Sequence, residues 1–144
     1  MTIREAVLED VPRLVELGAK FINGSHYKKH IPINLEKTQA SLETLIQIPS
    51  GVIFVSETRG RLEGMIGLLG SMHMFSDEPT YTEMFWFVDP KKRGSGIRLL
   101  KHAEKWAKEQ GAKRLFMIAP TKKVGKTYTR LKYQKLETFY IKRL

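Results

Sequence analysis

The chain has 144 residues, no cysteine and a formal net charge of +10 at pH 7. This length predicts one domain over residues 1–144. The missing cysteines exclude a disulfide framework, a thiolate metal site and a cysteine nucleophile. No apolar run is long enough to span a bilayer, and the N-terminal MTIREAVLED lacks the basic-then-apolar order of a secretion signal. We therefore expect a cytoplasmic protein without a membrane partner.

The positive charge is concentrated in the C-terminal part of the chain. Residues 1–90 hold 8 Lys/Arg and 12 Asp/Glu, whereas residues 91–144 hold 17 Lys/Arg and 3 Asp/Glu. A region this basic indicates an anionic partner. Nucleic acid, an anionic membrane and a polyphosphate cofactor all fit, as does a merely solvated cationic surface, and charge alone does not distinguish them.

The first ninety residues predict two helices between strands. A short strand over 2–6 leads to a helix that Asp10 caps, with apolar residues at helical spacing up to Ile22. A loop with His26, Tyr27 and His30 leads to a second helix, which Asn34 caps. Three strands follow over 52–57, 62–69 and 80–88. The turn at 58–61 joins the first two as a hairpin, and Pro90 ends the third.

The remaining residues predict a β-α-β unit and two closing elements. An amphipathic helix follows Ile97 and ends before Gly111. Next come a buried strand over Lys113–Ala119, a short polar helix over Thr121–Leu131 and a closing strand over Gln134–Leu144. The fold class is therefore mixed α/β, with a mostly antiparallel sheet, flanking helices and one crossover.

The segment Lys91-Lys92-Arg93-Gly94-Ser95-Gly96-Ile97 is the most informative part of the sequence. The first amides of a helix have no internal partner and carry the positive end of the helix dipole. Glycines allow close approach to the backbone, so a phosphate or pyrophosphate is the natural ligand. The segment matches neither a Walker A loop nor a Rossmann loop. By itself it is more typical of a tight turn before a helix than of a binding loop.

The surroundings of this loop make the chain similar to the GNAT superfamily of N-acetyltransferases. That family has Gln/Arg-x-x-Gly-x-Gly/Ala at the start of its central helix, after a strand ending in Val-x-Pro. This chain reads Val88-Asp89-Pro90-Lys91-Lys92-Arg93-Gly94-Ser95-Gly96, and Tyr128-Thr129-Arg130-Leu131-Lys132-Tyr133 resembles the family's second motif. The segment Glu137–Lys142 resembles its closing strand. The chain departs from the usual family residues at Lys91, Arg98, Thr121 and Lys132.

The resemblance implies acetyl-CoA as cosubstrate, without a metal. The pyrophosphate would lie on the amides of residues 93–98, and the pantetheine arm between the strand ending at Val88 and the one starting near Leu115. A backbone amide near Val88 would polarise the thioester carbonyl. The implied cofactor-binding residues are Phe87, Val88, Arg93, Gly94, Ser95, Gly96, Ile97, Arg98 and Tyr128.

Two residues are candidates for proton transfer. Tyr128 stands at the family position for the general acid, although a tyrosine that only packs would look the same. Glu83 is the only carboxylate inside its strand and has Met84 and Phe85 as neighbours. Apolar surroundings raise a carboxyl pKa, which suits a base, whereas a solvent-facing Glu83 is the alternative.

The predicted function is transfer of an acetyl group to an amine by direct attack in a ternary complex. His26 and His30, with Tyr27, lie where the family commonly builds its acceptor site, and Asp77 or Glu78 could attract a cationic amine. The alternatives are a nucleic-acid-binding module that uses the basic C-terminal half and a CoA-binding protein without catalysis. No nucleic-acid motif is present, so nucleic acid is the less favoured partner. A homodimer is the assembly that we consider beside the monomer.

Overall fold

A five-stranded sheet forms the centre of the computed structural model, which describes residues 1–92 and 94–144; the prediction for Arg93 lies outside them. The strand order is β1-β2-β3-β4-β5. All neighbours are antiparallel except β4 and β5, which are parallel. The strands are β1 (Thr2–Glu5), β2 (Gly51–Thr58), β3 (Arg61–Met72), β4 (Pro79–Val88) and β5 (Arg114–Phe116). The predicted mixed α/β fold class is confirmed.

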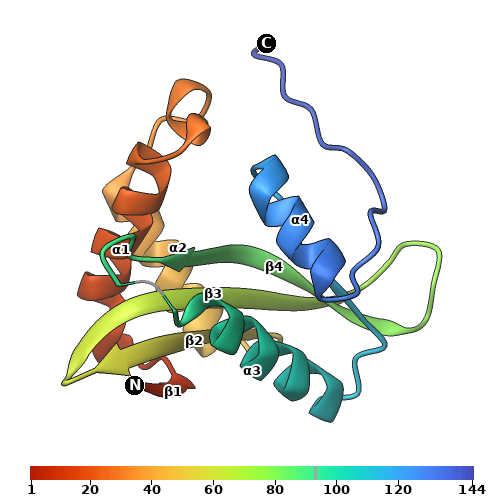
Figure 1. Cartoon of the computed structure of the whole chain (residues 1–144), viewed down its shortest axis with the longest axis horizontal. Helices are drawn as coiled ribbons and strands as arrows, with labels where there is room; N and C mark the ends of the chain where they lie inside the picture. The colour runs from red at the N-terminus through yellow and green to blue at the C-terminus, as the bar shows by residue number, and fades with distance from the viewer. Residues whose placement is uncertain (93) are drawn as a thin grey trace.

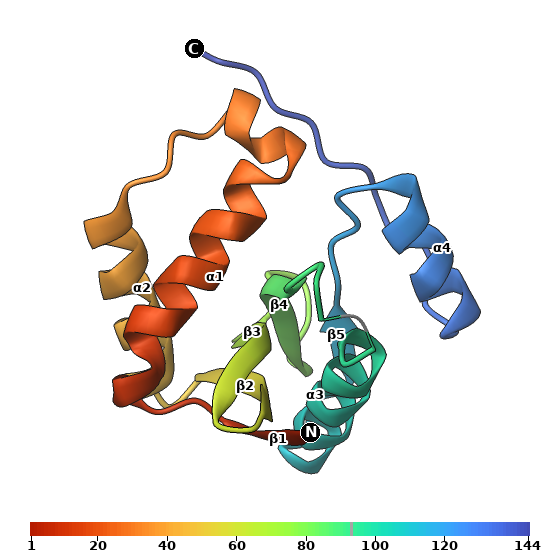
Figure 2. The ribbon, with the colours of Figure 1, turned by 60° about the vertical axis from the view of Figure 1, so that its left-hand side comes forward.

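Helices cover both faces of the sheet. One face carries α1 (Val11–Asn23) and α2 (Leu35–Gln47), and the other carries α3 (Gly96–Glu109) and α4 (Lys122–Arg130) (Figure 1, Figure 2). Two short 3₁₀ helices, η1 (Leu8–Asp10) and η2 (His26–Lys29), flank α1. The apolar stripes read from the sequence therefore point to two different cores on opposite sides of one sheet.

The two cores hold the helices against the sheet. On one side Leu14 and Leu17 of α1 pack with Leu42 and Leu45 of α2. The core on the other side contains buried residues of α3 and the ring of Tyr128, with β2 and β3 beneath them. The buried residues of α3 are Leu99, Leu100, Ala103 and Ala107. The site described below lies where these two layers meet at β4.

A β-bulge interrupts the pairing of β3 with β4. Gly67 pairs with Phe85 but the next residue, Leu68, pairs with Glu83, so Met84 is an extra residue on β4. A bulge re-aims the side chains around it and locally bends the strand. Here Glu83 is only 7% exposed, whereas Met84 is 52% exposed.

The strand β5 accompanies β4 only over Thr80–Thr82. Beyond Thr82 the chain after β5 leaves the sheet and leads to α4, and the second half of β4 has no strand on that side (Figure 2). The predicted strand over Lys113–Ala119 is therefore shorter than expected. The residues after Phe116 do not pair in the sheet, and Ile118 among them contacts the site described below.

Three local predictions have clear outcomes. Asn34 caps α2, because its Oδ1 accepts the Lys37 amide at 2.9 Å. Asp10 precedes α1 but its carboxylate does not cap the helix; it binds Arg4 at 2.8 Å and the Val7 amide instead. The turn of the first hairpin contains Arg59 and Gly60, both with positive φ (51° and 75°), as in the two-residue turns that suit strand twist.

The predicted closing strand over Gln134–Leu144 is wrong. The segment forms no strand and runs away from the sheet (Figure 1). Its alternating pattern offers a strand-like sequence, but a strand needs hydrogen-bonding partners, and β5 pairs over only three residues. Phe139 and Tyr140 are consequently 89% and 90% exposed.

Within the described residues, no helix is both long and apolar enough to cross a bilayer.

Candidate active site

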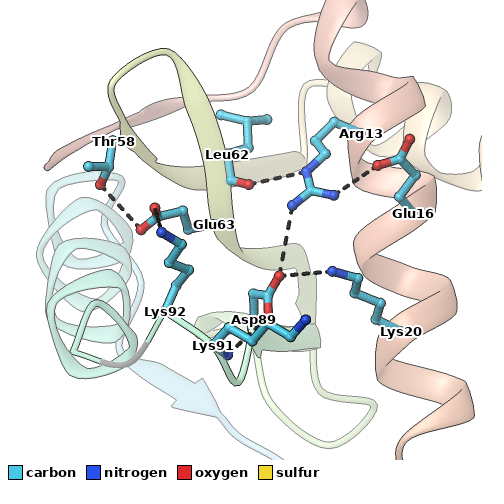
Figure 3. Close-up of polar contacts among 9 residues, drawn as sticks. All are labelled: Arg13, Glu16, Lys20, Thr58, Leu62, Glu63, Asp89, Lys91 and Lys92. Atoms are coloured by element: carbon cyan, nitrogen blue, oxygen red, sulfur yellow. Dashed lines mark hydrogen bonds and ion pairs between the residues drawn. The ribbon is translucent and has the colours of Figure 1, made fainter.

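The loop between β4 and α3 is tied to α1 through Asp89. This carboxylate is buried, accepts the Lys20 ammonium at 2.9 Å and the Lys91 amide at 3.1 Å, and lies 4.0 Å from Arg13 (Figure 3). The hydrogen bond from Lys20, and then that from the Lys91 amide, lower the pKa of Asp89 below its ordinary value. Asp89 therefore anchors the first residues of the loop while ionised.

A second contact fixes the other side of the loop. The Lys92 ammonium lies 3.8 Å from Glu63 of β3, and Glu63 also accepts the Thr58 hydroxyl at 3.2 Å (Figure 3). The Lys92 amide donates to the Asp89 carbonyl at 2.8 Å. Residues 89–92 are thus held from α1 on one side and from the β2–β3 hairpin on the other.

The side chain of the residue before α3 does not cap the first amides of this helix. Ser95 is the residue before the helix, but its hydroxyl is buried and hydrogen-bonded to the Ser56 hydroxyl at 3.1 Å, so it does not cap the helix. Gly94 adopts φ 115°, and a Cβ at this position would meet nothing within 4 Å. Ile97 and Arg98 are exposed. These features fit the predicted pyrophosphate site of acetyl-CoA.

Gly96 is the first residue of α3 and faces β4. A Cβ at Gly96 would lie 3.5 Å from the Trp86 ring and 3.6 Å from Val88, which are ordinary van der Waals distances, so a small side chain fits here. The Trp86 Nε1 donates to the Gly96 carbonyl at 3.2 Å. This hydrogen bond holds the first turn of α3 to β4.

The second half of β4 offers backbone groups on the side that β5 has left. The Asp89 amide donates to the backbone carbonyl of Glu63 in β3 at 2.8 Å. Backbone groups alternate along a strand, so the Phe87 groups also face β3, whereas those of Val88 and Trp86 face the open side. The Phe87 ring lies 5.8 Å from Phe21 on the opposite face. We therefore retain Val88 among the proposed contacts of acetyl-CoA and leave out Phe87.

The backbone of Ile118 connects the two predicted catalytic residues. Its amide donates to Glu83 Oε2 at 2.7 Å, and its carbonyl accepts a hydrogen bond from the Tyr128 hydroxyl at 2.9 Å. Ile118 lies in the segment where the chain leaves the sheet after β5. The structure thus brings Glu83 and Tyr128, which are 45 positions apart in the sequence, to the amide and the carbonyl of one residue.

Burial sets the protonation of both residues. It raises the pKa of Glu83 from 4.5 to about 7, although the Ile118 amide partly opposes the shift. Burial, and then the nearby charge of Glu83, raise the pKa of Tyr128 above its ordinary value. At neutral pH Glu83 is therefore partly ionised and able to take up a proton. Tyr128 is protonated, and its raised pKa makes it a weaker acid than an exposed tyrosine.

Packing around α4 fixes the orientation of Tyr128. Its ring is stacked on Trp86, with 5.8 Å between centroids and 26° between planes, and it also packs on Tyr133 at 5.4 Å. The Tyr133 hydroxyl in turn donates to Glu104 of α3 at 2.7 Å. The Tyr128 side chain is therefore held between β4 and α3, with its hydroxyl directed to Ile118.

A cavity of about 210 Å³ adjoins these groups. It lies between α1 and η2 on one side and the segment from Ile118 to α4 on the other, with the bulge of β4 between them. Of the predicted acceptor residues, Tyr27 lines this cavity. The His26 ring stacks on the Tyr27 ring, with 5.4 Å between the ring centroids, and does not line the cavity. His30 is not among its lining residues. Glu78, another candidate, pairs with Arg114.

Sequence reasoning missed three contributors to this site. Trp86 contacts both Gly96 and Tyr128, which a tryptophan inside an apolar strand does not reveal in the sequence. The Ile118 peptide acts through its backbone, which no side-chain pattern reveals. The Lys20–Asp89 pair joins residues 69 positions apart.

Within the described residues, no group of three or more His, Asp or Glu side chains is placed to hold a metal ion.

Comparison with known proteins agrees with this geometry. Residues 25–133 match the model of the acetyltransferase (GNAT) family. The chain therefore belongs to this family and is an acyltransferase. A comparison with curated protein sequences found no significant match.

Solved structures show the same fold at low sequence identity. One is a probable acetyltransferase, with a TM-score of 0.78 and 21% identity over 100% of this chain and 97% of the other. An aminoglycoside acetyltransferase from an uncultured soil metagenomic sample, in complex with sisomicin, has a TM-score of 0.75 and 17% identity over 99% and 95%. A ribosomal-protein-alanine N-acetyltransferase from Brucella melitensis biovar Abortus 2308 has a TM-score of 0.73 and 17% identity over 100% of both chains.

Proposed function

We propose that this acyltransferase moves the acetyl group of acetyl-CoA to a primary amine by direct attack in a ternary complex. The observation that supports the proposal is the Glu83–Ile118–Tyr128 arrangement, in which a buried carboxylate and a phenol line one cavity. Trp86, which also lines this cavity, is hydrogen-bonded to the first residue of α3. Bound acetyl-CoA would supply a thioester whose carbonyl carbon forms the new C–N bond and whose C–S bond breaks. The chain has no cysteine that could carry the acetyl group in between.

Cofactor binding and proton transfer are assigned to different residues of the site. The amides of Gly96, Ile97 and Arg98 would hold the pyrophosphate, and the Val88 amide would polarise the thioester carbonyl. Glu83 would accept a proton from the arriving ammonium group, so that the nitrogen lone pair becomes available. Tyr128 would give its proton to the departing sulfur, which requires its hydroxyl to exchange the Ile118 carbonyl for the sulfur. The nitrogen loses its second proton as the amide forms, and this proton would restore the Tyr128 hydroxyl.

Two measurements test this function. Thermal unfolding with CoA should show stabilisation, by about 2.7 kcal/mol at a hundredfold excess over the dissociation constant. Release of free thiol from acetyl-CoA should depend on an added primary amine. CoA binding without amine-dependent thiol release from any of a broad set of amines would favour the alternative of a CoA-binding protein without catalysis.

The nucleic-acid alternative makes a different prediction. The exposed cations of α4 would then bind phosphates, with nanomolar and sequence-dependent affinity. We expect only non-specific binding, with a dissociation constant of about 10⁻⁴–10⁻⁶ M near physiological salt. The cytoplasmic location and the homodimer remain predictions.

A further inference from the structure

The acceptor side of the cavity is built from apolar and aromatic side chains. Phe21 comes from α1 and Tyr27 from η2, with 5.6 Å between their ring centroids, and Ile31 follows η2. Across the cavity, Val124 and Tyr128 come from α4. Among the described residues that line the cavity, Glu83 is the only one with a carboxylate or a basic group. The walls can therefore bind an apolar body around one amine.

The elements that carry these walls have a positive surface. Exposed lysines occupy η2 on one side and α4 on the other. They are Lys28, Lys29, Lys122, Lys123 and Lys126. A second cation on the acceptor would find no second carboxylate in the cavity and would meet like charges on both sides. The charge distribution therefore disfavours polyamines.

The size of the cavity limits the acceptor further. Its volume is about 210 Å³, and an apolar cavity of about 150 Å³ is enough to bind benzene. Because the thioester must also reach this cavity, the acceptor has room for at most one six-membered ring or one branched alkyl group, with a short chain that leads to the amine. A larger apolar body would have to extend out of it.

From this geometry we infer that the acceptor is a small primary monoamine with an aromatic or branched aliphatic body. The amine lies at Glu83 and the body lies against Phe21, Tyr27 and Ile31. The inference rests on the proposed function, since it identifies the substrate class of the same site. It also separates this chain from an acetyltransferase of polycationic acceptors, despite the shared fold.

The test compares 2-phenylethylamine with spermidine, by catalysis and by binding. We expect kcat/KM for 2-phenylethylamine to exceed that for spermidine by at least about tenfold, since apolar pocket contacts of this kind change specificity by about 10–200-fold. Calorimetric titration of the CoA-saturated protein should show the same order of affinity. A higher kcat/KM or tighter binding for spermidine would overturn the inference.

A variant at Ile31 tests the charge argument directly. Ile31 is 43% exposed, so a polar residue can replace it without burial of a new charge. Ile31→Glu adds a second carboxylate beside the cavity and should raise the preference for spermidine over 2-phenylethylamine by up to about fivefold, the range of exposed ion pairs. The matched Ile31→Gln variant removes the same apolar contact without adding a charge, so it should raise the preference for spermidine less than Ile31→Glu does. An equal change in both variants would contradict the charge argument.

Failure of the proposed function has a different signature. In that case no amine supports thiol release from acetyl-CoA, while the binding comparison still decides between the two amine classes. Conversely, thiol release that is fastest with spermidine leaves the acetyltransferase function intact and refutes only the assignment of an apolar monoamine.

Discussion

Replacement of Glu83 by glutamine changes one buried charge and tests both the stability and the catalytic argument. The folded protein raises the pKa of this carboxyl from 4.5 to about 7, mainly because it is buried. Between these two values the folded chain binds more protons than the unfolded chain. The free energy of unfolding of the wild type therefore falls as the pH rises through this interval, and the loss is complete above about pH 7.

The size of this effect follows from the shift. Each pKa unit corresponds to about 1.4 kcal/mol, so the full cost of ionised Glu83 is up to about 3 kcal/mol. The Glu83→Gln side chain keeps an oxygen that can accept the Ile118 amide and carries no charge. Glu83→Gln should therefore be more stable than the wild type by up to about 3 kcal/mol near pH 8, and the difference should shrink to near zero at about pH 4.

Denaturant unfolding at several pH values gives the stability difference, and thiol release gives the activity. Glu83→Gln should lower kcat/KM by about 10²–10⁴-fold, the usual contribution of a general base, while the wild-type kcat/KM rises through about pH 7. The control is Glu137→Gln, since Glu137 is exposed in the C-terminal segment and its change should affect neither quantity. A Glu83→Gln protein with wild-type kcat/KM, or with no stability gain at high pH, would refute the reasoning.

Two further substitutions address the acid and the loop. Tyr128→Phe should lower kcat by about 10²–10⁴-fold with nearly unchanged acetyl-CoA affinity, and it should lose about 1 kcal/mol of stability because the hydrogen bond to the Ile118 carbonyl is gone. An unchanged kcat would show that Tyr128 only packs. Gly94→Ala and Gly60→Ala both place a Cβ on a residue with positive φ and open space around it, so both should lose stability. Only Gly94→Ala should weaken CoA binding in calorimetry; equal CoA affinities in both variants would remove the loop from the proposed site.

The sequence was sufficient where the evidence for a feature is local. Apolar neighbours on the strand predicted the buried Glu83, and a basic glycine-containing loop before a helix predicted the uncapped amides of α3. The bulge at Met84 and the Ile118 peptide were not predictable in this way. Both depend on how β4 is paired by β3 and β5, and pairing joins residues that are distant in the sequence.

The same distinction explains the two structural errors. The alternating pattern of Gln134–Leu144 is a local property, but a strand also needs a paired neighbour, which the three-residue β5 does not supply. Asp10 stands at a typical cap position, yet Arg4 on the neighbouring strand competes for its carboxylate at 2.8 Å. In both cases a partner outside the element decided the outcome: a neighbouring strand was absent for Gln134–Leu144, and Arg4, six positions away, was present for Asp10.

The end of α4 carries the most specific departure from the family pattern, and the structure shows what it changes. Lys132 has φ 71°, the left-handed conformation that the family's usual glycine adopts easily. The Tyr133 amide donates to the Tyr128 carbonyl at 2.9 Å, and the Lys132 amide donates to Thr129 at 3.1 Å. These are the two hydrogen bonds of a Schellman motif, and the packing of Tyr133 on Tyr128 is its usual apolar contact. The motif is therefore formed in spite of Lys132.

Lys132→Gly should consequently stabilise the protein without changing catalysis. A left-handed residue with a Cβ costs about 1–2 kcal/mol, and the greater freedom of glycine in the unfolded chain returns about 0.5–1 kcal/mol of that. The expected net gain is about 0.5–1 kcal/mol, or roughly 2–4 °C in Tm. Arg59→Gly, at the hairpin residue with φ 51°, is the matched control and should gain a similar amount far from the site. If Lys132→Gly instead lowered kcat while Arg59→Gly did not, Lys132 would have a role in the site beyond ending the helix, because the backbone that orients Tyr128 already has the geometry that glycine prefers.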